Sequence, residues 1–449
     1  MSLDPAREPL DVDALLDDPK TRIVVCCGSG GVGKTTTAAA LGLRAAERGR
    51  SVVVLTIDPA RRLAQSMGID SLDNVPRRVE DIKGEGELCA MMLDMKRTFD
   101  EIVEAHADAE RAKAILDNPF YQSLSAGFAG TQEYMAMEKL GQLRSRDEWD
   151  LIVVDTPPSR SALDFLDAPK RLGSFLDGKL IRLLMAPAKV GGRAGMKFLN
   201  VGMSMMTGAL GKLLGGQLLR DVQTFVAAMD TMFGGFRKRA DATYRLLQAP
   251  GTAFLVVASP ERDALREAAY FVERLAADDM PLAGLVLNRV HGSGADDLSA
   301  ERALAAAENL EERRIVDQED GKIGVRSSSE APNSPEAPDS SHNTDGSDGS
   351  DDIEGDSEST GTPRSVDGTP VDGTSVDGLT AGLLRLHAER MRLIDRERHT
   401  RDRFTALHPE VAVAEVPALP GDVHDLAGLR AIGDRLAAAD GTSGPAGAA

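Results

Sequence analysis

The stretch GSGGVGKTTT, from Gly28 to Thr37, follows a short apolar, β-branched run and leads into an alanine-rich segment. It meets the pattern G-x-x-x-x-G-K-[ST]. Glycines let backbone N–H groups turn inward around a phosphate chain, and the N-terminus of the following helix adds partial positive charge. Because strand, loop and helix coincide, the pattern predicts a phosphate-binding P-loop. The residues that we expect to bind phosphate are Gly28, Ser29, Gly30, Gly31, Val32, Gly33, Lys34, Thr35 and Thr36.

Two side chains of this loop and one distant acid suggest how a nucleotide would be held. Lys34 is placed to reach the β- and γ-phosphates, and the Thr35 hydroxyl is placed to ligate Mg²⁺. A second apolar run, residues 151–154, ends in Asp155. An acid at the carboxyl end of a parallel strand can face the P-loop and hold Mg²⁺ through water. We therefore expect Mg²⁺ at Thr35 and Asp155.

A third strand-like run, residues 51–57, is closed by Asp58 and Pro59. An Asp-Pro pair is by itself an ordinary turn former. The same aspartate, on a loop beside the γ-phosphate, could instead orient or deprotonate the attacking water. The local sequence leaves both interpretations open.

Size and composition narrow the class of protein. The chain has 449 residues, 42% hydrophobic residues and a net charge of −19, so it can build a large core and is a poor candidate for nucleic-acid binding. Its three cysteines form neither a disulfide framework nor a CxxC metal pair. The acidic start lacks a signal-peptide pattern, and no run of 18 uncharged apolar residues suggests a transmembrane helix. We expect a cytoplasmic protein.

The order of the predicted elements indicates one α/β fold. Strands near 22–27, 51–57, 87–94 and 150–155 alternate with helices, which predicts a mostly parallel sheet flanked by helices. Alternation resumes after a Met-rich helical insertion, and again after an acidic loop. The expected segments are an N-terminal extension (1–20), the first part of the core (21–170), a helical Met/Gly-rich subdomain (171–248), the second part of the core (249–312), a disordered acidic low-complexity insertion (313–378), the C-terminal part of the core (379–440) and a disordered tail (441–449).

The acidic insertion has a distinct composition. Residues 327–363 contain ten Asp or Glu and neither Lys nor Arg. Such a segment cannot bury enough apolar surface to offset its ordering entropy, which predicts disorder. It is either a tolerated insertion without function or an acidic docking or regulatory arm.

The helical insertion carries seven of the sixteen methionines within residues 185–232. Apolar residues there recur every three or four positions over 197–218, which predicts an amphipathic helix. This stripe could pack on the protein's own core or on a dimer partner, form an adaptable groove for an apolar client helix, or contact a membrane surface. The candidate client-binding residues are Met203, Met205, Met206, Leu210 and Leu213.

These motifs, in this order, resemble the ArsA-type family of anion-pump ATPases and tail-anchored-protein targeting ATPases. Besides the P-loop, the resemblance is carried by LTIDPARRLAQSMG, VVDTPPSRSALDFLDAP, LVLNRV and VPALPGDVHDLAGL, and it extends over roughly 20–310 and 379–438. Within the family the chain is most similar to the actinobacterial members. The resemblance implies a P-loop NTPase that hydrolyses ATP with Mg²⁺ as a nucleotide-sandwiched dimer.

The resemblance also implies roles for particular residues. Asp58 falls on the position that orients the attacking water, beside Lys34, and Asp155 on the Walker B acid. Asn288 matches the adenine-reading asparagine, and Glu267 lies near a glutamate of the family's nucleotide site. The stretch that starts at Pro417 matches the loop that covers the base.

Ser29 departs from the family pattern, which has a lysine that reaches across the dimer to the partner's phosphates. A hydroxyl cannot supply that charge. Three outcomes stay open: slow hydrolysis by a homodimer that uses another cation, a heterodimer with a lysine-bearing paralogue, or an ATP-bound clamp with little hydrolysis. Arg160 either supplies the missing positive charge or is a solvated residue of the switch segment.

Two further comparisons with the family restrict function. The cysteines are predicted on central strands rather than in the helical insertion, so we expect no arsenite site. No CxxC zinc pair exists to join a dimer. The leading hypothesis is an ATPase that couples its cycle to hydrophobic helical client proteins, and the alternative is a nucleotide-sensing regulatory subunit of a heteromeric ATPase. A ParA/MinD-like positioning role is weakest, because no basic DNA-binding face and no terminal amphipathic membrane helix is apparent.

Overall fold

The structure is a computed structural model of the chain, and it describes residues 9–58, 62–119, 121–122, 131–157, 225, 235, 238–323 and 376–438, without the side chains of 131 and 313–323. The described residues belong to two compact units. One holds the chain up to Gly294 together with the part from Leu393 on, and the other holds Ala295–Arg392. No helix in these ranges is both long enough and apolar enough to cross a membrane.

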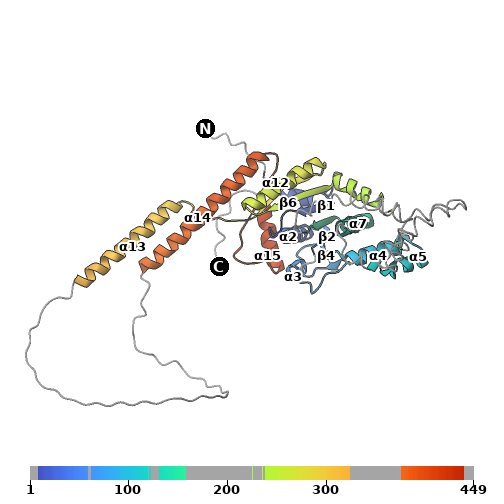
Figure 1. Ribbon diagram of the computed structural model, residues 1–449, viewed down its shortest axis with the longest axis horizontal. Coiled ribbons are helices and arrows are strands. Elements are labelled where there is room, and N and C mark those ends of the chain that lie inside the picture. The colour runs from blue at the N-terminus through green and yellow to red at the C-terminus, as the bar shows by residue number, and fades with distance from the viewer. Residues whose placement is uncertain are drawn as a thin grey trace, which may run out of the picture. The chain divides into compact units, whose positions relative to one another are not determined.

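The first unit is built on an eight-stranded sheet with the order β3-β4-β2-β5-β1-β6-β7-β8 (Figure 1). All neighbouring strands are parallel except β3 and β4, so the predicted mostly parallel α/β fold is confirmed. Short antiparallel β3 was not predicted. The strands are β1 (Ile23–Cys27), β2 (Ser51–Thr56), β3 (Arg77–Arg78), β4 (Glu87–Met92), β5 (Leu151–Asp155), β6 (Thr252–Ala258), β7 (Leu282–Val290) and β8 (Val413–Pro417).

Both faces of the sheet are buried, which explains the continuous apolar strands. In β1, Ile23, Val25 and Cys27 enter one core, whereas Val24 and Cys26 enter the other. The first core includes residues from α4 (Met95–His106), α5 (Ala109–Leu116), α7 (Thr131–Arg146) and α12 (Arg262–Ala277). The second includes residues from α1 (Val12–Asp17), α2 (Lys34–Glu47), α3 (Arg62–Ser66) and α15 (Leu426–Ala437).

The described part of the N-terminal extension packs on this core. Val12 and Leu16 of α1 are fully buried, and Asp13 of the same helix pairs with Arg44 of α2 at 2.5 Å. Arg44 also pairs with Asp434 at 2.9 Å. The pair with Asp434 links α2 to α15, which lies near the C-terminus.

The second unit is a pair of helices, α13 (Ala300–Ile323) and the N-terminal part of α14 (Val376–Leu407). Small side chains, Ala303 and Ala307 on α13 and Ala381 and Ala388 on α14, are buried. Arg385 pairs with Glu311 at 2.6 Å. The segment from residue 379 on, which the sequence assigns to the core, begins in this second unit and belongs to the sheet-bearing unit from Leu393 on.

The helices also extend past the expected boundaries of the acidic insertion. α13 continues to Ile323, beyond residue 312, and α14 begins at Val376, before residue 379. Residues 324–375 lie outside the described residues, and so do Arg160 and the client-binding candidates Met203, Met205, Met206, Leu210 and Leu213.

Two glycines of the P-loop provide a matched test of how closely the loop packs against β6. A Cβ at Gly28 would lie 2.1 Å from the carbonyl oxygen of Val257 in β6, whereas a Cβ at Gly31 would meet nothing within 4 Å. Both have left-handed φ values, 149° and 78°. Gly28→Ala should therefore lower the free energy of unfolding by more than about 2 kcal/mol, and Gly31→Ala by about 1 kcal/mol. Urea unfolding of nucleotide-free protein measures both, and equal losses would contradict the close contact with β6.

Candidate nucleotide-binding site

The P-loop joins the central strand β1 to α2. Gly33 caps α2 in a left-handed conformation, with φ 96°, which glycine adopts at little cost. Lys34, the first residue of α2, is buried, and its Nζ donates to the carbonyl oxygen of Ser29 at 2.8 Å. Burial lowers the pKa of Lys34, while the Asp155 charge opposes that shift. The predicted phosphate-binding lysine is thus held against its own loop.

Asp155 ends β5 and is fully buried beside the P-loop. The hydroxyls of Thr35 and Thr56 each donate to its Oδ2 at 2.8 Å. Its other oxygen, Oδ1, is buried and has no hydrogen-bond partner among the described residues. Burial raises the pKa of this carboxyl to about 6. Three segments distant in sequence therefore converge on one carboxylate.

This arrangement fits a magnesium site. The buried carboxylate oxygen and the adjacent hydroxyl are the hard oxygen donors that Mg²⁺ prefers, with phosphate and water completing its shell. Within the described ranges no group of three or more His, Cys, Asp and Glu side chains could hold a metal alone. When bound, the ion would neutralise phosphate charge, and Thr35 and Asp155 would hold it.

Thr56 was not predicted as a site residue. It ends β2, opposite Asp155 in the parallel register of β2 and β5. Sequence could not identify it without knowing which strands are neighbours. A hydroxyl at the carboxyl end of a strand that leads into an Asp-Pro turn was the available signal.

The backbone around Asp58 is fixed by contacts with three elements. The N–H of Ile57 donates to the carbonyl oxygen of Asp155 at 3.0 Å, and the N–H of Asp58 donates to Thr56 Oγ1 at 3.2 Å. Gln132 of α7, a second residue that we did not predict, donates from Nε2 to the carbonyl oxygen of Ile57 at 2.9 Å. Asp58 thus follows closely on the end of β2, next to the end of β5 that carries Asp155.

A cavity of about 460 Å³ opens beside the start of α2. Asn288 lies at its base, where Nδ2 donates to the carbonyl oxygen of Val32 at 2.8 Å, and a Cβ at Gly33 would lie 2.2 Å from that nitrogen. Glu267, half-buried on α12, is not among its lining residues, so the structure does not bring it to this site. The cavity is lined by Gly33, Thr36, Asn288, Arg289, His291, Pro417, Ala418, Leu419, Pro420, Gly421, Asp422, Val423 and Ile432.

The cysteines do not converge. Cys26 and Cys27 lie on β1 and are buried, and burial raises the pKa of the Cys27 thiol to about 12. Cys89 lies on β4, and two strands separate β4 from β1. With strands about 4.8 Å apart, the two locations are about 14 Å from each other. The thiols therefore cannot surround one metalloid in this arrangement.

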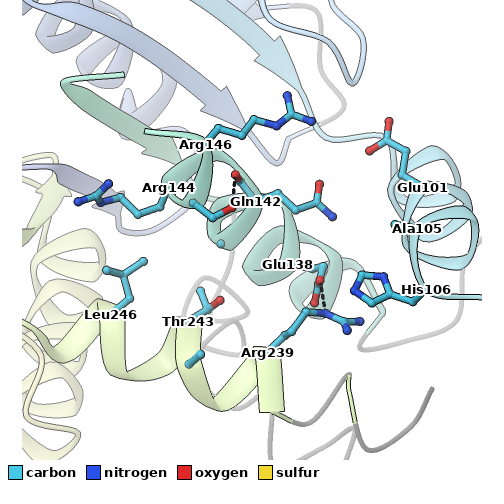
Figure 2. A pocket seen from close by; sticks show the side chains of 13 residues that line it. Glu101, Ala105, His106, Glu138, Gln142, Arg144, Arg146, Arg239, Thr243 and Leu246 are labelled. Atoms are coloured by element: carbon cyan, nitrogen blue, oxygen red, sulfur yellow. Dashed lines mark hydrogen bonds and ion pairs between the residues drawn. The ribbon is translucent and has the colours of Figure 1, made fainter. Parts of the chain in front are cut away.

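A larger cavity, about 700 Å³, lies between α4, the C-terminal half of α7 and the helical residues 238–248 (Figure 2). Its carboxylates already have partners. Glu138 accepts from Arg239 Nε at 2.5 Å and from Tyr134 at 3.0 Å, and Glu101 pairs with Lys139 at 2.8 Å. The N-terminal end of α7 reaches the carboxyl ends of the strands through Gln132, which contacts Ile57. This cavity is lined by the opposite end of α7 and therefore lies toward the amino ends of the strands.

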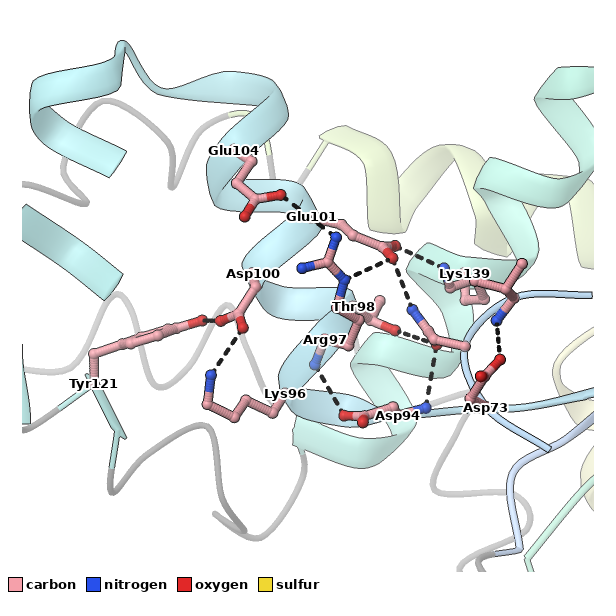
Figure 3. Close-up of polar contacts among 12 residues, drawn as sticks. Asp73, Asp94, Lys96, Arg97, Thr98, Asp100, Glu101, Glu104, Tyr121 and Lys139 are labelled. Carbon is pink, nitrogen blue, oxygen red and sulfur yellow. Dashed lines mark hydrogen bonds and ion pairs between the residues drawn. The ribbon is translucent and has the colours of Figure 1, made fainter. Parts of the chain in front are cut away.

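The surroundings of Glu101 explain how α4 is held (Figure 3). Asn74, buried in the segment before β3, donates to Glu101 at 3.2 Å. Its oxygen accepts from the Thr98 hydroxyl at 3.0 Å and from the Asp94 N–H at 3.1 Å. This network satisfies buried polar groups and anchors α4, so we assign it a structural role.

The sheet order, the P-loop after its central strand and the acid at the end of β5 define a P-loop nucleoside triphosphatase. Residues 21–320 match the pattern of the anion-transporting ATPases, and the chain belongs to this family. It is accordingly an ATPase, as the sequence predicted.

Fungal proteins named ATPase GET3 are among its relatives. The protein from Podospora anserina is 25% identical over 67% of this chain and 83% of its own length. The one from Ajellomyces dermatitidis is 27% identical over 66% and 80%. The one from Malassezia globosa is 30% identical over 38% of this chain, and the match spans only 49% of that protein.

The buried carboxylate predicts a pH-dependent effect of Asp155→Asn. Between the usual pKa of 3.8 and the raised value of about 6, the unfolded carboxyl is ionised while the folded one is protonated, so stability falls as pH rises through this window. The full cost above pH 6 is on the order of 3 kcal/mol. Asp155→Asn should therefore raise the melting temperature of nucleotide-free protein at pH 8, and by about half as much at pH 5, which lies near the middle of this window.

Calorimetry at both pH values measures this effect, with Asp150→Asn as a control carboxylate at the exposed start of the same segment. An equal change of melting temperature at pH 5 and pH 8 would contradict the raised pKa.

Proposed function

We propose that this ATPase binds Mg-ATP at the P-loop, works as a dimer and couples its nucleotide cycle to the binding of apolar helical segments of client proteins. The single observation that supports the nucleotide part is the convergence of Thr35, Thr56 and Asp155 beside Lys34. Asp58 would orient the attacking water, and Thr35 and Asp155 would hold Mg²⁺. Asn288 and the loop from Pro417 would surround the adenine.

The client part of the proposal is supported by sequence and by family. Seven of sixteen methionines fall within residues 185–232, and methionine suits surfaces that accept varied apolar partners. Family members target tail-anchored proteins, whose anchors are apolar helices, as the resemblance implies. A soluble carrier of such helices needs an adaptable apolar surface, which this segment can supply.

Ser29 supports a second candidate. Its backbone carbonyl accepts from Lys34, but its hydroxyl brings no positive charge to a partner's phosphate. In the second candidate, this chain is a nucleotide-sensing subunit of a heteromeric ATPase. A lysine-bearing paralogue would then supply the positive charge to the phosphates bound by this chain. The two candidates differ in whether this chain itself binds apolar helices.

A triple substitution separates them. Met203→Ser, Met205→Ser and Met206→Ser together should weaken binding of a fluorescent apolar helical peptide at least tenfold, because they remove apolar area from one face. ATP affinity should stay unchanged. The matched control replaces the same three residues with leucine, which keeps the surface apolar and should retain peptide binding. If the wild type, the serine variant and the leucine variant bind the peptide equally well, or if none of them binds it, the regulatory subunit would be favoured.

A further inference from the structure

The end of β7 is irregular next to the nucleotide cavity. Its pairing with β8 shifts between Asn288 and Val290, and the intervening Arg289 has a left-handed φ of 63°. That conformation costs a residue with a side chain about 1–2 kcal/mol. The bulge therefore requires contacts that hold it, and residues on both sides of it line the cavity.

Glu397 of α14 supplies such contacts from a distant part of the sequence. One carboxylate oxygen accepts from the backbone N–H of His291 at 3.0 Å. The other lies 2.7 Å from His291 Nδ1. Glu397 is only 8% exposed, so this carboxylate is aimed at His291 rather than at solvent. Both residues belong to the unit that carries the sheet.

The contacts fix how the imidazole is presented. A carboxylate only accepts hydrogen bonds, so the proton of the neutral ring is on Nδ1, and Nε2 is left as an acceptor. The hydrogen bond from the backbone N–H of His291 to Glu397 also fixes the backbone from which the imidazole extends. His291 lines the cavity together with Asn288 and Pro417. A pre-oriented acceptor therefore borders the space where we place the nucleoside.

Charged side chains lie around the pair of His291 and Glu397. A smaller cavity of about 250 Å³ is lined by His291 and Glu397 themselves, together with Arg398, Arg401 and Glu415. Arg401 is held by Glu415 at 2.9 Å. His291 therefore borders both cavities, whereas Glu397 lines the smaller one and reaches the nucleotide cavity only through its contact with His291.

We propose that His291 is a nucleoside-contacting residue of this ATPase and that Glu397 is its positioning residue. His291 Nε2 accepts a hydrogen bond from a donor of the nucleoside, either a ribose hydroxyl or the adenine amino group. This inference rests on the proposed placement of the nucleotide. It adds an acceptor to the recognition that Asn288 and the loop from Pro417 would provide.

The test is calorimetric binding of ATP to the full chain, with kcat and KM measured in parallel. His291→Ala and His291→Phe should each weaken ATP binding about three- to tenfold, the range for one hydrogen bond, with kcat within about twofold. Phenylalanine keeps an aromatic ring without nitrogen.

Glu397→Ala should weaken ATP binding to a similar extent, and Glu397→Gln should weaken it less. The double variant His291→Ala, Glu397→Ala should weaken ATP binding no more than either single variant. Asp395→Asn, an exposed acid on the same helix, is the control and should bind ATP normally.

Two analogues identify the donor. If it is a ribose hydroxyl, the loss caused by His291→Phe disappears with 2′,3′-dideoxy-ATP, and if it is the amino group, the loss disappears with purine riboside triphosphate. Unchanged ATP affinity in His291→Phe would overturn the proposal, as would equal losses with ATP and both analogues. Absence of ATP binding by the wild-type chain would instead overturn the nucleotide site itself, which is a different failure.

Discussion

The Asp155 carboxylate is the constraint on which the site depends. Burial at the end of β5 opposes its ionisation, yet Thr35 and Thr56 both donate to it and leave its second oxygen without a partner among the described residues. A buried carboxylate with an open oxygen is costly in the empty protein and useful when a cation is bound. If Mg²⁺ binds here as proposed, it would relieve this unfavourable burial of charge, and the relief would add to its affinity.

The parallel sheet produces this arrangement. β1 lies between β5 and β6, and β2 lies on the far side of β5, so the ends of three neighbouring strands deliver the P-loop, Asp155 and Thr56 to one edge. Asp58 continues from β2 at the same edge. On the other side of β1, β6 contacts Gly28, and β7 and β8 bring Asn288 and Pro417 to the cavity. The proposed phosphate and base regions therefore lie next to each other at the carboxyl ends of the strands.

The sequence predicted the parts of this design that are local. The P-loop, Asp155 and the alternating elements are each recorded in a short stretch, and the family resemblance added Asn288 and Pro417. Thr56, Gln132 and Glu397 were not predicted, because their roles depend on which strands and helices become neighbours. Glu267, which the resemblance places near the nucleotide, lies on α12 and is not among the residues that line the cavity, so its role stays a prediction. The separate α13–α14 unit was also not predicted, because buried alanines on two helices give no signal of whether the helices pack on each other or on a sheet.

The most direct test of the account is Mg²⁺-dependent ATP turnover by the purified full chain, compared with Lys34→Ala, with solution mass recorded with and without ATP. If the Asp155 site works as described, turnover requires Mg²⁺ and is abolished in Lys34→Ala, and the active species has twice the monomer mass. ATP binding without turnover would assign the missing cation at Ser29 to a partner chain. Turnover that persists unchanged in Lys34→Ala would contradict the account, because it would place the reaction outside the P-loop.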